Sequence, residues 1–271
     1  MATPLPRPRT PEQLYASVAA TADDIAALLH AGADPASRIP RSEWTVGEAA
    51  AHLALANELM ADLAAGAERR YGDGTPGSLA AANAASLAAF PERTPGVLAD
   101  AISGHARAFV TAARTAAQPS GAIMTPMGAM DLETLGSYLL THMLGHGWDL
   151  ARALRRPHMI DRERAGLCLP FLLTAMPRVV DPAAVGGLTA QYTLGLRGGP
   201  RFTAAFDSGV LTVTPGPAER PDCTIITEPV TFLLIALGRC SPWAAIARGG
   251  IRAWGRRPLL VPAFPRAFRA P

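Results

Sequence analysis

Two histidines lie four positions apart in the segment THMLGHGWDLARALRRP (residues 141–157), within a stretch otherwise rich in Ala and Leu. If this stretch is a helix, positions i and i+4 share one face, with Cβ atoms about 5–6 Å apart. His142 and His146 would then be able to bind one metal ion, and Asp149, three residues further on, would share their face. Hydrogen bonding inside an apolar core is the alternative, because a buried polar group without a partner costs about 1–3 kcal/mol.

A third histidine falls on the apolar stripe of another expected helix. Thr45 and Glu48 form a T-x-x-E capping box, which predicts a helix from there to about Gly66, with His52 two turns inside it. Trp44, directly before this helix, is interpreted as an anchor of the helix end. Packed helices lie about 8–10 Å apart, so the third imidazole can reach the same ion as the other two.

Three imidazoles on one ion leave a position open for water or substrate, as in a catalytic rather than a structural site. A divalent metal is therefore expected as a cofactor. Zinc is the first candidate, and iron, nickel and copper also accept imidazole ligands.

The elements that must position these residues follow from periodicity and from turn residues. Thr10 and Asp131 are expected to cap helices, and a change to short alternating runs separated by Gly and Pro begins after Pro182. Helices are predicted at residues 9–32, 45–66, 78–90, 94–118, 131–156 and 161–178. Strands are predicted at residues 189–197, 200–206, 209–214, 222–227 and 250–255, with short helices at residues 229–237 and 242–248. An antiparallel helical bundle followed by a small, mainly antiparallel sheet is the expected architecture.

Composition excludes several classes of protein. Of the 271 residues, 49% are hydrophobic and 17% are charged, which suits two domains with buried cores. The net charge of +3 is spread thinly, so no nucleic-acid partner is expected. No apolar run approaches the roughly 18 residues that span a bilayer, and a signal peptide is not recognisable, so we expect a cytoplasmic protein without a membrane partner.

The three cysteines are widely spaced and odd in number, which favours reduced thiols over disulfides. No pattern in the sequence indicates an oligomeric state.

The segment WTVGEAAAHLA around His52, together with HMLGHGWDLARALRRP, resembles the N-terminal domain of the mycothiol-dependent maleylpyruvate isomerase family, a branch of the DinB-like metal-binding four-helix bundles. In that family a Trp-Thr-Val helix start precedes one ligand histidine, and a later E-x-x-x-H-x-x-D-L segment supplies the other two ligands. The resemblance implies metal ligands at His52, His142 and His146, and it matches Asp149 to the recurring acid of the motif. His142 stands where the family usually has Glu, which raises the charge of the site by one.

The segment PDCTIITEPVTFLLIALGRCSPWAAIARGGIRAWG (residues 221–255) is similar to the sterol-carrier-protein-2-like domain that many members of the family carry. The fold class predicted with this resemblance is an all-α bundle plus α+β. A DinB-like four-helix bundle is expected over residues 1–182, and a small sterol-carrier-protein-2-like α+β domain over residues 183–271.

The family implies an enzyme with mycothiol or a similar low-molecular-weight thiol as cosubstrate and a small electrophilic molecule as substrate. A free thiol has a pKa of about 8.5, whereas coordination to a metal deprotonates it. The thiolate would add to a cis double bond conjugated with a carbonyl and leave after rotation, which is cis-trans isomerisation, or it would stay on the substrate, which is S-transfer.

Either reaction needs a cation for the substrate carboxylate or enolate, and the planar fork of Arg suits two oxygens. Arg239 and Arg248, which flank SPWAAIA, are the candidates, with a surface role as the alternative. Asp149 would fix the tautomer of a ligand histidine or pair with a nearby arginine. Trp148 is interpreted as an anchor of its helix end, and it is also the candidate residue for cofactor binding at the border of the substrate pocket.

Two other classes of function remain open from the sequence. In one, a metal-bound water is the nucleophile of a thiol-independent hydrolase or tailoring enzyme. In the other, the α+β domain holds an apolar ligand, and the bundle is the scaffold of a non-catalytic binding protein.

Overall fold

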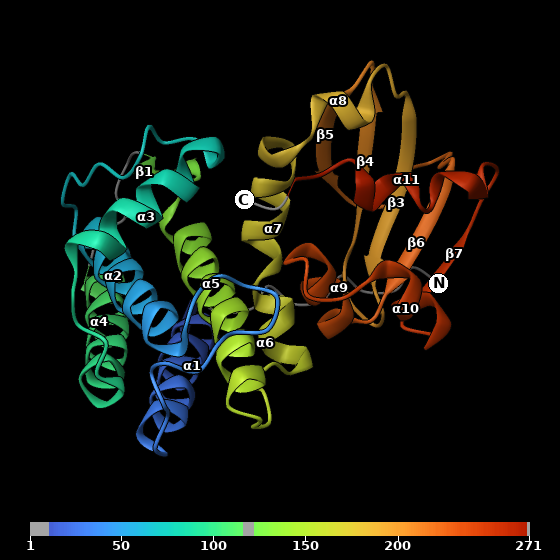
Figure 1. Cartoon of the computed structure of the whole chain (residues 1–271). Helices are drawn as coiled ribbons and strands as arrows, with labels where there is room; N and C mark the ends of the chain where they lie inside the picture. Colours follow the sequence, from blue (N-terminus) through green and yellow to red (C-terminus); the bar gives the residue numbers. More distant parts are fainter. Residues whose placement is uncertain (1–10, 116–121, 270–271) are drawn as a thin grey trace. The chain divides into compact units, whose positions relative to one another are not determined.

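The chain is described by a computed structural model, which covers residues 11–115 and 122–269. The described residues divide into two compact units, one extending to Ile160 and the other beginning at Asp161. The first unit consists almost entirely of helices, and the second is a sheet with short helices around it (Figure 1). The predicted fold class, an all-α bundle followed by an α+β unit, is confirmed.

Four long helices form the first unit, and each packs against two of the others, which closes a four-helix bundle. These helices are α1 (Pro11–His30), α2 (Val46–Ala64), α4 (Pro95–Thr115) and α5 (Leu132–Ala153). α1 and α2 each pack against α4 and α5. The shorter elements are η1 (Pro76–Ser78), α3 (Leu79–Ala89), and the hairpin of β1 (Ile123–Thr125) and β2 (Gly128–Met130). No helix in the described part of the chain is long and apolar enough to cross a membrane.

Side-chain caps determine where the two helices of the candidate site begin. The backbone N–H of Glu48 donates to Thr45 Oγ1 (3.3 Å), and the Thr45 N–H donates to Glu48 Oε2 (2.8 Å), so the predicted capping box is present. Asp131 Oδ1 accepts from the Thr134 N–H (2.7 Å) at the start of α5, which confirms the second predicted cap. The predicted cap at Thr10 and the helix end expected near Gln118 lie outside the described residues.

The second unit is built on a five-stranded sheet in the order β5-β4-β3-β6-β7. Only β3 and β6 run parallel, and the other neighbours are antiparallel, as expected for a mainly antiparallel sheet. The strands are β3 (Ala190–Leu196), β4 (Arg201–Asp207), β5 (Val210–Pro215), β6 (Cys223–Thr227) and β7 (Ile251–Trp254). The helices are α6 (Arg162–Leu167), α7 (Leu169–Ala175), η2 (Met176–Val179), α8 (Pro182–Val185), α9 (Pro229–Ala236), α10 (Pro242–Ala247), η3 (Pro258–Leu260) and α11 (Ala263–Arg266).

The division between the units comes earlier than the boundary after residue 182 that the sequence suggested. Leu169 on α7 belongs to the buried cluster beneath the sheet, and Leu173 and Met176 pack against that cluster. Residues 161–179 therefore share a core with the strands. The prediction of one helix over residues 161–178 was wrong, because Pro170 has no backbone N–H to continue the hydrogen-bond ladder and the helix breaks between α6 and α7.

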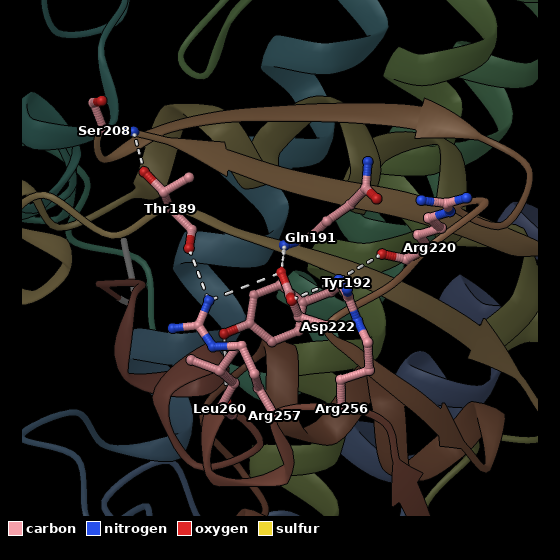
Figure 2. A network of polar contacts seen from close by, with 9 residues as sticks. All are labelled: Thr189, Gln191, Tyr192, Ser208, Arg220, Asp222, Arg256, Arg257 and Leu260. Atoms are coloured by element: carbon pink, nitrogen blue, oxygen red, sulfur yellow. Dashed lines mark hydrogen bonds and ion pairs between the residues drawn. The ribbon is translucent and has the colours of Figure 1, made fainter.

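A polar network joins three strands of the second unit around Asp222 (Figure 2). The Asp222 carboxylate accepts from the backbone N–H of Gln191 (2.9 Å) and pairs with Arg256 Nη2 (2.9 Å). The backbone oxygen of Asp222 accepts from the Arg257 N–H (2.9 Å). One carboxylate thus connects the starts of β3 and β6 with the segment that follows β7.

The helices α9 and α10 lie in the connection between two neighbouring strands, β6 and β7. This connection, residues 228–250, is called the excursion below. Thr227 at the end of β6 pairs with Ile251 at the start of β7. The Glu228 N–H donates to the Gly250 oxygen (2.8 Å), so the excursion is closed by hydrogen bonds at its base.

Gly255 lies so close to the backbone at the start of β6 that a residue with a Cβ atom would not fit at this position. A Cβ atom at Gly255 would lie 2.5 Å from the Asp222 oxygen and 2.9 Å from Cys223 Cα, and its φ of +147° is rarely adopted by L side chains. We expect Gly255→Ala to lower the free energy of unfolding of the second unit by about 2 kcal/mol or more, because backbone atoms must move apart. Chemical denaturation would measure the change in the free energy of unfolding. Hydrogen exchange of peptides from β6 and β7 would show whether the change lies in the second unit.

Gly187→Ala is the matched control, because a Cβ there meets no atom within 4 Å and φ is ordinary. Equal stability of Gly255→Ala and the wild type would show that the close approach of the two backbones is not a constraint.

Candidate metal centre

The three histidines singled out in the sequence lie together where α2 packs against α5. His52 comes from α2, and His142 and His146 come from α5. The Nε2 atoms of His52 and His142 are 2.9 Å apart, and one ring nitrogen from each histidine lies within 4.8 Å of the others. The ring centroids are separated by 4.6–4.9 Å in all three pairs. The arrangement therefore brings three nitrogen donors from two helices to one point.

This donor set fits a metal ion of the zinc type. Nitrogens bound at about 2.0–2.1 Å in a tetrahedral site lie about 3.4 Å from one another. The His52–His142 pair, at 2.9 Å, is closer than that separation, and one nitrogen from each histidine lies within 4.8 Å of the others, so the group could hold one ion. Imidazole donors are compatible with zinc, iron, nickel and copper, and a set of three leaves room for another ligand.

Burial determines the protonation state of the histidine from α2. His52 is 5% exposed, and the loss of hydration lowers its pKa to about 4. Its imidazole is therefore neutral at neutral pH and keeps a lone pair on one ring nitrogen. A neutral ring is the form that binds a metal.

Asp149 lies beside the last histidine of the group. Its Oδ2 is 3.8 Å from His146 Nδ1, and both side chains are largely buried, with 16% and 18% of their surfaces exposed. The carboxylate therefore lies on the Nδ1 side of the His146 ring, at a separation longer than a hydrogen bond. The orienting role expected for Asp149 stays a prediction.

Two aromatic side chains that were not predicted to belong to the site, Trp44 and Tyr138, lie against the histidines. The Trp44 indole centroid is 4.9 Å from that of His52 and 5.8 Å from that of His146, and its plane is inclined by 22° to the His146 ring. Tyr138 meets His142 edge-on at 6.4 Å, and burial raises the pKa of its phenol well above the usual range. The i, i+4 spacing of Tyr138 and His142 could have indicated this neighbour, whereas the position of Trp44 depends on a loop.

Trp148 packs against side chains near the C-terminal end of α5. Its ring packs on His158, with centroids 4.5 Å apart, and the Arg152 guanidinium lies 5.9 Å from the ring centroid. These contacts place the indole near the C-terminal end of α5, between Arg152 of the last turn and His158 beyond the helix. The cofactor-binding role of Trp148 stays a prediction.

Arg239 and Arg248 both belong to the excursion in the second unit. Arg239 Nη1 donates to the Leu237 oxygen, and Arg248 Nη2 lies 3.5 Å from Cys240 Sγ. Both guanidinium groups contact the turn between α9 and α10. A role toward substrate stays a prediction for each.

A four-helix bundle with three converging imidazoles defines the first unit as a candidate metal-binding helical domain. Residues 15–151 match the model of the mycothiol maleylpyruvate isomerase N-terminal domain, which covers half of the chain. The chain belongs to this family, and the suspected family is thereby confirmed.

Solved structures resemble the chain at low sequence identity. The crystal structure of a mycothiol-dependent maleylpyruvate isomerase is 15% identical over 90% of this chain and 93% of that chain, with a TM-score of 0.48. A histidine-to-alanine mutant of the mycothiol-dependent maleylpyruvate isomerase gives the same identity and coverage and a TM-score of 0.50. This likeness concerns the fold alone.

A stereoselective inverting sec-alkylsulfatase from Pseudomonas sp. is 15% identical over 51% of this chain, with a TM-score of 0.33. The match covers 25% of the sulfatase, so the chain corresponds to only about a quarter of that protein. No curated protein sequence matches the chain.

If the three histidines share one ion, His52→Ala is expected to weaken zinc binding by more than about 100-fold, because changes outside the ligand set alone cost about 10–100-fold. Competition with a chromophoric chelator would measure the affinity. Zinc should also raise the melting temperature of the wild type but not of the variant, because only the protein that binds the ion is stabilised by it.

His105→Ala is the control, since His105 is on α4 and is not a member of the histidine group. Unchanged zinc affinity in His52→Ala would exclude a shared ion at this position.

Proposed function

We propose that the protein is a metal-dependent enzyme that uses mycothiol, or a similar low-molecular-weight thiol, on a small electrophilic substrate. The reaction is cis-trans isomerisation or transfer of the thiol. The observation that carries this proposal is the meeting of His52, His142 and His146 between α2 and α5, in a chain of the maleylpyruvate isomerase family.

The histidine group would hold the ion, and its composition determines the charge of the site. All three donors are imidazoles, and no carboxylate is among them, so the charge of a divalent ion is not reduced by its protein ligands. When bound, such an ion supplies the positive charge that favours the thiolate form of a bound thiol. A positive charge that the ligands themselves do not neutralise attracts an anionic ligand to a partly buried site.

The side chains around the group would orient and shield it. The Asp149 carboxylate, 3.8 Å from His146 Nδ1, favours the tautomer that carries its proton on Nδ1. The proton on Nδ1 leaves the lone pair on Nε2. The indole of Trp44 lies against His52 and His146 and keeps water from that side of the rings.

The isomerisation consists of an addition and an elimination. The thiolate sulfur forms a bond to one carbon of the cis double bond, and the electron pair moves onto the conjugated carbonyl oxygen as an enolate. Rotation about the new single bond and loss of the sulfur give the trans product and return the thiolate. In a transfer reaction the carbon–sulfur bond is kept, and a proton is added or a leaving group departs. Arg239 or Arg248 would pair with the substrate carboxylate or the enolate oxygen.

The test combines thiol binding with turnover. Protein loaded with zinc would be mixed with mycothiol and with maleylpyruvate, and mass spectrometry and absorbance would record the thiol, the adduct and the trans isomer. We expect conversion or adduct formation that requires the thiol and is lost in His142→Ala, with the circular dichroism spectrum retained. The disulfide form of mycothiol, which has no free thiol, serves as the matched control.

Each other outcome identifies a different class of function. If zinc binds but no thiol is bound or consumed, a thiol-independent hydrolase or tailoring enzyme replaces the proposal. If an apolar ligand binds and no substrate is converted with any metal, the protein is a non-catalytic binder.

A further inference from the structure

Trp44, which directly precedes the N-cap of α2, is held in place through its backbone. The Ile39 N–H donates to the Trp44 oxygen (3.1 Å), and the Trp44 N–H donates to Ser42 Oγ (3.1 Å). Arg38 and Thr45 form an antiparallel bridge, and Thr45 is the N-cap of the helix. The loop and the capping box therefore fix the starting point of the Trp44 side chain.

From this fixed point the indole reaches histidines on two different helices. It lies across His146 of α5 in a stacked arrangement, with 22° between the planes and 5.8 Å between the centroids. It meets His52 of α2 at 4.9 Å with a tilt of 55°. Trp44 thus contacts two of the three members of the histidine group simultaneously.

Such contacts matter because the backbone does not determine the direction of an imidazole ring. The terminal torsion of His is broad and roughly two-fold, so neighbouring groups must select the ring orientation. A shared ion needs nitrogen lone pairs aimed at one point, and a shift of a fraction of an ångström weakens the site. His146 has Asp149 beside its Nδ1 edge and Trp44 on its face, so its ring is restrained from two directions.

We propose that Trp44 is a positioning residue of the metal centre, which holds the rings of His52 and His146 in the orientation in which they share one ion. This inference rests on the proposed function insofar as it requires that the histidine group binds a metal. It assigns to Trp44 a role through the two histidines, without contact to the ion.

A purely structural role for Trp44 makes a different prediction. An apolar residue just before the N-cap often packs on the first turns of a helix as a hydrophobic staple. Leucine can serve as such a staple but cannot stack on an imidazole, whereas phenylalanine can do both. The pair Trp44→Leu and Trp44→Phe therefore separates helix anchoring from ring orientation.

The experiment uses Co²⁺ and the full chain, because the visible absorption of Co²⁺ reports the number and arrangement of its ligands. We expect Trp44→Leu to raise the Co²⁺ dissociation constant by about 10-fold to 100-fold, the range for loss of an orienting partner. We also expect the visible spectrum to shift toward weaker bands of higher coordination number. Trp44→Phe should recover most of the affinity and the wild-type spectrum. Trp243→Leu, at an exposed tryptophan on α10, is the matched control and should behave as the wild type.

The outcomes separate this inference from the proposed function. If the wild type binds no Co²⁺ or zinc, both are wrong. If the wild type binds Co²⁺ and Trp44→Leu matches it in affinity and spectrum, only the positioning role is wrong. Equal weakening by Trp44→Leu and Trp44→Phe would also overturn it, because the stacked ring would then not be the cause.

A second measurement covers the case in which Trp44→Leu does not fold. In a variant with Trp148, Trp243 and Trp254 all changed to Phe, Trp44 is the remaining source of tryptophan emission. One equivalent of Co²⁺ should quench this emission strongly, and His52→Ala should abolish the quenching at the same concentration. Emission that is unchanged at saturating Co²⁺ would place the indole away from the ion and overturn the proposal.

Discussion

The packing of α2 against α5 is the interaction on which the candidate site depends. It places a buried histidine of one helix 2.9 Å from a histidine of the other, in a bundle whose interior is mostly Ala, Leu, Ile and Val. Polar rings in such an interior need polar partners, because a buried polar group without one costs free energy of folding. A metal ion can be such a partner for several nitrogens simultaneously. The types of the donor side chains and the packing of the two helices therefore both favour a metal site.

Two helix caps fix the positions of the helices that carry the histidines. The capping box at Thr45 fixes the start of α2, and through it the position of Trp44. The Asp131 cap fixes the start of α5, from which the spacing of His142 and His146 follows. Local backbone chemistry thus sets the register of two helices, and that register decides which side chains meet.

Much of this arrangement could be predicted from the sequence, because it depends on local signals. The i, i+4 histidines, the capping box and the alternating strands each depend on a few neighbouring residues, and the corresponding elements formed as expected. The position of the unit boundary could not be obtained in the same way. It depends on Leu169 and Met176 packing beneath the sheet, a contact between residues distant in sequence. The neighbourhood of Trp44 was missed for the same reason, since its direction follows from the loop hydrogen bonds to Ile39 and Ser42.

The excursion formed by α9 and α10 has a consequence for how the second unit can diverge. Its base is closed by the pairing of Thr227 with Ile251 and by the hydrogen bond from Glu228 to Gly250, while β6 and β7 remain neighbours in the sheet. Residues between these points can be exchanged, lengthened or shortened without altering strand register, because the two ends stay in contact whatever lies between them. Arg239 and Arg248 lie in this segment. Related chains can therefore gain or lose arginines here during evolution while the pairing of β6 with β7 is kept.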